Sequence, residues 1–149
     1  MNILSSMQNI VPKKTQIIAL VAVFNHQELL LLKRPDDVHC GGLWSLPGGK
    51  VEDSEMPLQA AIRELKEETN LSGKLWRHLG KSSHHYNDRI LNFLLFVCCC
   101  PDISKMSPES KHLWVKRNQL HDYPMPEANK PLINMLFMDE VDEYLRGNV

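Results

Sequence analysis

The sequence predicts an α/β fold in which a mixed β-sheet is sandwiched between helices (α/β/α). Two observations support this fold class. Apolar runs of strand-like composition lie on both sides of a central amphipathic segment, and a second segment with helical spacing lies near the C-terminus. The chain has 149 residues, 43% of them hydrophobic, which suits one substantial core. We therefore expect a single domain over residues 1–149.

The first two strands are predicted close to the N-terminus. Residues 1–14 resemble a loose leader without regular patterning. Residues 16–24 are rich in Ile, Val, Leu and Ala, which is typical of a buried strand. Residues 29–32 form a second short apolar run, and Asn25 and His26 mark a turn between the two. A β-hairpin is the simplest interpretation.

The central helix is predicted from its apolar spacing. Residues 41–49 are rich in Gly, Trp and Pro, which interrupts regular structure. Four apolar residues then recur at i, i+3, i+4 and i+7, namely Leu58, Ala61, Ile62 and Leu65. This pattern predicts an amphipathic helix over residues 57–68 with these four side chains facing the core.

The C-terminal half is predicted to contain two more strands and a last helix. Residues 90–100 and 113–115 have strand-like composition. Residues 130–145 have helical character, with the apolar positions Leu132, Ile133, Leu136, Phe137 and Val141. Three of the four cysteines are consecutive, Cys98 to Cys100, a spacing that suits neither a disulfide framework nor a Cys-x-x-Cys zinc site. We expect buried thiols, with a redox role as the alternative.

Charge and hydropathy exclude several classes of partner. The chain has 17 basic and 18 acidic residues, so no basic stripe suggests a polymeric nucleic acid. The N-terminal stretch lacks the basic start and sustained apolar run of a secretion signal, and no apolar run is long enough for a membrane span. The expectation is a cytoplasmic protein that does not bind a membrane.

Three glutamates of the central helix crowd one face. Glu64, Glu67 and Glu68 are related by i+3 and i+4, and like charges at these spacings oppose each other by roughly 0.2 to 0.5 kcal/mol per pair. A hard cation such as Mg²⁺, which takes oxygen ligands and shares them with phosphates, would relieve this repulsion. A solvated acidic helix face remains the alternative for the glutamates taken alone.

The segment 49–71 resembles the Nudix box, G-x5-E-x7-R-E-U-x-E-E-x-G-U, where U is apolar. The matching residues are Gly49, Glu55, Arg63, Glu64, Leu65, Glu67, Glu68 and Leu71. One position departs, because Asn70 stands where the box has its last glycine. Asparagine is the next-best residue for the left-handed turn that ends a helix, so the geometry should survive.

The resemblance implies a metal site and a fold-stabilising pair. Glu64, Glu67 and Glu68 would hold Mg²⁺, or Mn²⁺ as a substitute, with the main-chain carbonyl of Gly48 as a further ligand. Glu64 would also be the base that activates water, so these three glutamates are the catalytic candidates. Structural roles are implied for three other residues of the box: Gly49, and Glu55 paired with Arg63.

Beyond the box, residues 15–136 are similar to the MutT group, which hydrolyses nucleoside triphosphates to the monophosphate and pyrophosphate and removes 8-oxo-dGTP. The proline-flanked segment 123–131 resembles the stretch in which an asparagine, here Asn129, reads the purine edge. Arg34 and Arg89 match positions that contact phosphate or base. Glu109 matches a fourth carboxylate brought to the metal from a loop. Leu46 departs, because MutT has an aromatic residue there.

Two other functions stay open. A Nudix hydrolase of another diphosphate, such as a pyrimidine nucleotide, ADP-ribose or a nucleotide sugar, would share the metal site and differ in the base pocket. A Nudix-fold module that binds nucleotide without cutting usually lacks glutamates of the box, whereas all three are present here. The expected partner is a small nucleotide, and the expected assembly is a monomer or a homodimer.

Overall fold

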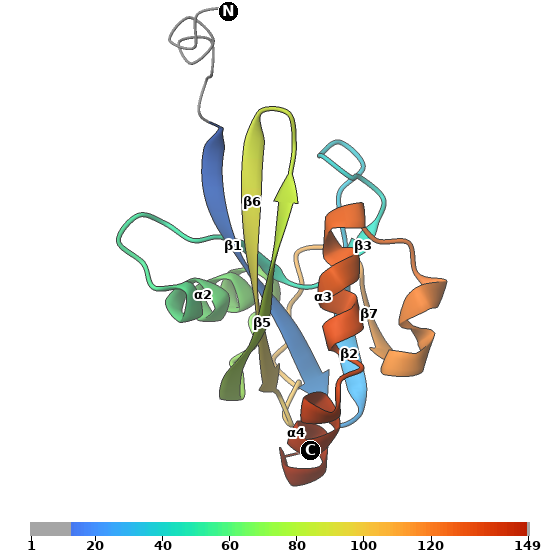
Figure 1. Cartoon of the computed structure of the whole chain (residues 1–149). Helices are drawn as coiled ribbons and strands as arrows, with labels where there is room; N and C mark the ends of the chain where they lie inside the picture. The colour runs from blue at the N-terminus through green and yellow to red at the C-terminus, as the bar shows by residue number, and fades with distance from the viewer. Residues whose placement is uncertain (1–12, 149) are drawn as a thin grey trace, which may run out of the picture.

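The computed structural model describes residues 13–148 (Figure 1). Most of the expected leader, residues 1–14, therefore lies outside the described residues. Lys14 already belongs to the first strand.

The described residues form a mixed seven-stranded sheet. Its strands are β1 (Lys14–Asn25), β2 (Glu28–Lys33), β3 (Trp44–Ser45), β4 (Gly48–Lys50), β5 (Lys74–His85), β6 (Arg89–Cys99) and β7 (His112–Lys116). The main path runs β3-β2-β1-β6-β5, with β4 paired to β1 and β7 paired to β2. Only the β1 and β6 pair is parallel, and the others are antiparallel. The predicted hairpin is present as β1 and β2.

Helices cover both faces of this sheet, as the sequence predicts. The α2 helix (Pro57–Thr69) lies on one face and α3 (Lys130–Met135) on the other (Figure 1). The second face is also covered by η1 (Arg117–Asp122), η2 (Glu127–Asn129) and α4 (Asp139–Asn148). Successive side chains of a strand point to opposite faces, and those of β1 accordingly alternate between the two cores. The architecture is therefore α/β/α.

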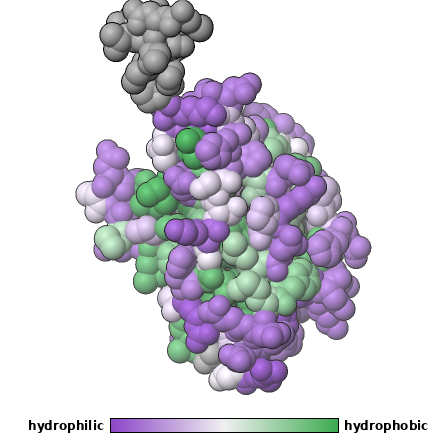
Figure 2. All heavy atoms as spheres, viewed as in Figure 1, coloured by the Kyte–Doolittle hydropathy of each residue, from purple (hydrophilic) through white to green (hydrophobic). Residues whose placement is uncertain are grey.

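The prediction that Leu58 and Ile62 face the core is wrong. Their exposed fractions are 39% and 44%, whereas Ala60, Ala61 and Leu65 are fully buried. The helix packs mainly on β1 and β4. Ala60 and Ala61 are small and contact the sheet closely. The larger side chains of Leu58 and Ile62 lie at the edge of the buried face and therefore remain exposed to solvent. Apolar side chains reach the surface beside α2 in Figure 2.

The sequence also misjudged two elements in the C-terminal half. The strand β5 was not predicted, and the expected single helix over residues 130–145 is two helices, α3 and α4. Phe137, one of the apolar positions of the expected helix, lies in the break between them with an exposed fraction of 41%. The break is a series of tight turns, in which the main-chain N–H groups of residues 136–138 donate to carbonyls three residues earlier.

The consecutive cysteines are buried, as expected. Cys98 and Cys99 end β6 and Cys100 follows it, and all three are free thiols. The thiols of Cys99 and Cys100 donate to the carbonyls of Lys74 and Ser72, at 3.6 and 3.5 Å. Within residues 13–148, no helix has both the length and the hydropathy to span a membrane.

Candidate active site

The glycine pair at the start of β4 places the loop before α2 close to the sheet and the helix. Gly48 has φ 149°, and a Cβ there would collide with the carbonyl oxygen of Ala19 in the neighbouring β1. A Cβ on Gly49 would lie 2.5 Å from the carboxylate of Glu64. Gly48 therefore needs glycine, since a side chain would push the loop away from β1, whereas a side chain at Gly49 would displace the carboxylate of Glu64.

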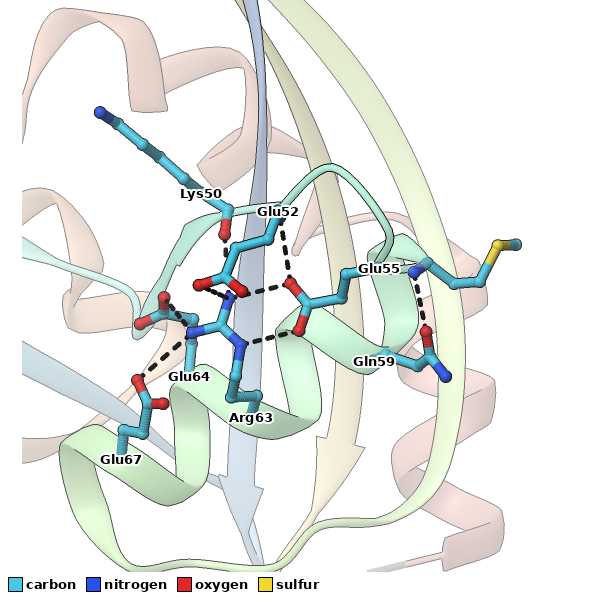
Figure 3. A network of polar contacts seen from close by, with 8 residues as sticks. Lys50, Glu52, Glu55, Gln59, Arg63, Glu64 and Glu67 are labelled. Carbon is cyan, nitrogen blue, oxygen red and sulfur yellow. Dashed lines mark hydrogen bonds and ion pairs between the residues drawn. The ribbon is translucent and has the colours of Figure 1, made fainter.

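Arg63 joins this loop to the helix (Figure 3). Its Nε donates to Glu55 Oε2 at 2.7 Å and its Nη2 to Glu55 Oε1 at 2.9 Å, which is a two-point guanidinium–carboxylate pair. Nη2 also donates to the main-chain carbonyl of Lys50 at 3.0 Å. The hydrogen bonds from Arg63 lower the pKa of Glu55, and the same pair raises the pKa of Arg63. The loop is thereby tied to the first half of α2.

Polar side chains form hydrogen bonds at both ends of α2. At the start, the main-chain N–H of Met56 donates to the side chain of Gln59 at 2.8 Å. At the end, Asn70 adopts the left-handed conformation with φ 60° and donates through its main chain to Lys66. Its side-chain amide donates to the carbonyl of Lys105 at 2.9 Å. Asparagine thus ends this helix in the conformation that glycine would otherwise supply.

Glu68 lies at the centre of a group of carboxylates. The main-chain N–H of Gly48 donates to Glu68 Oε1 at 3.1 Å. Burial raises the pKa of Glu68 to about 8, helped by a hydrogen bond with Glu64 and by the negative charges of Glu64 and Glu109, and opposed by the Gly48 N–H. The main-chain N–H of Glu109 donates to the carbonyl oxygen of Glu68 at 2.9 Å. Glu64, Glu68 and Glu109 are therefore near neighbours, although they come from α2 and from a distant loop.

Glu67 lies apart from this group. Its side chain is 57% exposed and accepts a hydrogen bond from Nη1 of Arg63 at 3.3 Å. The same nitrogen donates to Glu64 Oε1 at 2.9 Å, as Figure 3 shows. Nowhere in the part of the chain that the structure describes do three acidic, His or Cys side chains converge closely enough to hold a metal ion. The carboxylates are close enough to repel one another but are not gathered around one point.

The chemistry of these donors nevertheless fits a hard divalent cation. Glu64, Glu68 and Glu109 offer carboxylate oxygens, and Gly48 offers a main-chain carbonyl, which are the ligands that Mg²⁺ and Mn²⁺ prefer. The raised pKa of Glu68 shows that negative charge is unfavourable here. A divalent cation would offset that penalty, and Glu67 could join the group if Arg63 released it.

An open pocket of about 370 Å³ adjoins the carboxylates. Its floor is apolar and comes from β1 and β6, through Ile18, Leu20, Leu91 and Phe93. It also contains Gly48, Gly49, Glu68 and Glu109 from the metal-site candidates and their loop, and all four substrate-site candidates, Arg34, Leu46, Arg89 and Asn129. Glu64 and Glu67 are not among its lining residues. The fold thus brings most of the expected residues to one cavity.

Two of the substrate-site candidates have unused hydrogen-bonding capacity. Asn129 is a buried polar residue, 6% exposed, and its side chain does not cap the helix that follows. The guanidinium of Arg89 lies over the ring of Tyr86, 5.1 Å from its centroid, and its Nε is buried without a hydrogen-bond partner in the described part of the chain. Arg34 instead donates through Nε to the carbonyl of His39 at 2.9 Å.

The sequence did not identify three other residues of the pocket. Gln16, His39 and Tyr86 also line it. The signal for Gln16 was present, because the alternation along β1 places it on the same face as Ile18 and Leu20. Tyr86 follows β5, which was not predicted, so its position at the pocket could not be foreseen. Tyr86 contacts His39 edge to face, with ring centroids 5.8 Å apart.

Comparisons with known proteins show the family of this chain. The NUDIX domain family matches residues 19–135. An 8-oxo-dGTP diphosphatase from Proteus vulgaris is 38% identical over 85 residues, covering 57% of this chain and 76% of that protein. A CTP pyrophosphohydrolase from Escherichia coli (strain K12) is 27% identical over 124 residues, covering 81% and 90%.

Solved structures agree as well. The structure reported for MutT from Aliivibrio salmonicida and Vibrio cholerae is 30% identical, with a TM-score of 0.65, and the match covers 83% of this chain and 97% of that one. The family match spans well over half of the chain, and the relatives are named diphosphatases or pyrophosphohydrolases. The chain therefore belongs to the NUDIX domain family and is a Nudix hydrolase.

Proposed function

We propose that this protein hydrolyses a nucleoside triphosphate to the monophosphate and pyrophosphate in the presence of Mg²⁺, with an oxidised purine nucleotide such as 8-oxo-dGTP as the preferred substrate. One observation carries the proposal. A single pocket has carboxylates, Glu68 and Glu109, beside a cleft with an apolar floor and two polar groups, the Asn129 amide and Arg89 Nε, that have no hydrogen-bond partner within residues 13–148. Such a pocket can bind a charged phosphate chain and a flat base at the same time.

The roles follow from the chemistry of the donors. Glu64, Glu67, Glu68 and Glu109, with the carbonyl of Gly48, would hold the cation, which neutralises the phosphate chain and makes water more acidic. Glu64 would accept the proton of the attacking water, as the P–O bond to the leaving group breaks. Arg34 and Arg89 would contact phosphate or base, and Leu46 and Asn129 would contact the base.

A second candidate substrate is a pyrimidine nucleotide. Leu46 is buried in the pocket, where the MutT group has an aromatic residue. A protein named CTP pyrophosphohydrolase is also among the relatives of this chain. The metal site would be the same for both substrates. The contacts to the base therefore determine whether a purine or a pyrimidine nucleotide is preferred.

The test is a nucleotide panel assayed with Mg²⁺ and with a chelator. We expect monophosphate and pyrophosphate as products, and no turnover without the divalent ion. Glu64→Gln should lower kcat by about 10²-fold or more, as is typical for loss of a general base, without a change in Tm. Glu143→Gln on the exposed face of α4 is the matched control and should have no effect. Undiminished turnover by Glu64→Gln would refute its role.

Specificity is tested with the same panel. We expect a higher kcat/KM for 8-oxo-dGTP than for dGTP, and a smaller preference in Asn129→Ala, because the amide can donate and accept at the purine edge. Equal kcat/KM values for the two purines, with CTP cleaved faster, would favour the pyrimidine substrate.

A further inference from the structure

Gln16 is a polar residue of β1, and every residue that follows it on the same face of the strand is apolar. The side chains that follow it on this face, Ile18, Leu20, Ala22 and Phe24, belong to the core beneath α3 and α4 or pack against it. Gln16 is only half-buried and lines the pocket at the start of the strand. Gln16 therefore places one primary amide beside the apolar floor of the pocket.

The neighbours of Gln16 in the sheet leave its amide unpaired. In the parallel register it lies beside Leu91 of β6, and Arg89 stands two residues earlier on the same face of that strand. Leu91 and Phe93 cannot accept or donate a hydrogen bond through their side chains. Across residues 13–148, the amide of Gln16 has no hydrogen-bond partner.

Asn129 supplies, from another wall of the same pocket, a second amide that has no hydrogen-bond partner among the described residues. It comes from η2, which lies with α3 on the face of the sheet toward which Gln16 points, and both residues line the cavity. Each amide has an oxygen that accepts and an NH₂ group that donates, whereas Arg89 only donates. The three groups surround an apolar floor on which a flat ring can pack.

We propose that Gln16 is a specificity-determining residue, whose amide hydrogen-bonds the polar edge of the nucleobase together with Asn129. The inference rests on the proposed function, since it names a further contact to the base of that substrate. A polar pocket group that pairs with its ligand discriminates strongly, because an analogue without the matching atom leaves the group unpaired.

The experiment measures equilibrium binding, which does not depend on catalysis. Calorimetry would give Kd values for 8-oxo-dGMP, dGMP, CMP and inorganic pyrophosphate, which has no base. Two variants separate shape from hydrogen bonding: Gln16→Leu removes all polar atoms, and Gln16→Glu keeps the size but removes the NH₂ donor. Thr15→Val, the exposed neighbour on the opposite face of β1, is the matched control.

We expect Gln16→Leu to weaken the preferred monophosphate about tenfold and to reduce the ratio of Kd values between the nucleotides, with pyrophosphate binding unchanged. A tenfold loss is what one or two hydrogen bonds contribute. Gln16→Glu should change which monophosphate binds best, while Thr15→Val should bind like the parent. Kd ratios in both Gln16 variants that match the parent within twofold would overturn the inference and leave Gln16 as a solvated strand residue.

The outcomes also separate this inference from the proposed function. A parent protein that cleaves no nucleotide, yet binds monophosphates with a selectivity that Gln16→Leu removes, would refute the proposed function and support the inference. A parent protein that cleaves nucleotides, while Gln16→Leu and Gln16→Glu keep the Kd ratios of the parent, would support the proposed function and refute the inference.

Discussion

Arg63 sets the position of several groups at the candidate site with one side chain. Its guanidinium holds Glu55 and the carbonyl of Lys50 on the loop side, and Glu64 and Glu67 on the helix side. Lysine cannot reproduce the two-point pair with Glu55, because its ammonium lacks the planar fork.

We therefore predict that Arg63→Lys lowers kcat by about 10- to 100-fold, the range typical for residues that orient metal ligands. The Tm should fall as well, because the pair with Glu55 is partly buried, with side chains that are 26% and 14% exposed. Arg117→Lys is a matched control, because Arg117 pairs with Asp142 at 2.7 Å outside the pocket. Its turnover should equal that of the parent. Equal losses of turnover in both variants would contradict the assigned role.

At the scale of single residues, the sequence anticipated contacts within one segment better than contacts between segments. The pair of Glu55 and Arg63 was expected because the 49–71 segment resembles the Nudix box. By contrast, the hydrogen bond from the main chain of Glu109 to that of Glu68 depends on how a distant loop folds against the end of α2. The separation of Glu67 from the other carboxylates depends on the reach of Arg63. No spacing rule contains this information.

At the scale of elements, α2 gives a direct test of which face it buries. Leu65 is fully buried between helix and sheet, whereas Ile62 is 44% exposed. We predict that Leu65→Ala lowers the free energy of unfolding by about 2 to 5 kcal/mol, the usual range for a cavity in a core. Ile62→Gln should change it by less than about 0.5 kcal/mol, as is usual at a surface. Denaturant unfolding measures both changes in the free energy of unfolding. A larger loss in Ile62→Gln than in Leu65→Ala would show that Ile62 belongs to the buried face of α2, as the sequence predicted.

The sequence predicted correctly those elements whose burial gives a clear apolar pattern. The strand β1 is apolar on both faces because helices cover both sides of it, so its composition was sufficient. The edge strand β5 carries many exposed polar side chains and two register shifts, so its alternation is obscured. The C-terminal helices share one apolar pattern, and the only sign of their break is the acidic first turn of α4, at Asp139, Glu140 and Asp142.

At the scale of the whole molecule, the partly buried carboxylate of Glu68 links stability to pH. Its pKa is about 8 in the folded protein, well above the ordinary value of 4.5. Between these two values the folded state binds more protons than the unfolded state, so the free energy of unfolding falls as pH rises. The stabilising contribution is complete below about pH 4.5 and is lost as pH rises through 8.

Mg²⁺ should therefore stabilise the protein more at pH 8.5 than at pH 6, because at the lower pH a proton competes for Glu68. Thermal unfolding with and without Mg²⁺ at both values would measure this difference. Glu68→Gln should remove most of the pH dependence of the Mg²⁺ effect. An increase in Tm that is the same at both pH values in the parent protein would show that Glu68 is not involved.

The distribution of the four cysteines has a practical consequence. Cys98, Cys99 and Cys100 are buried at the end of β6, whereas Cys40 is partly exposed and lines the pocket. The folded protein thus offers a single accessible thiol. A maleimide fluorophore would attach there alone, and it would report ligand entry without any engineering of the remaining sulfur atoms.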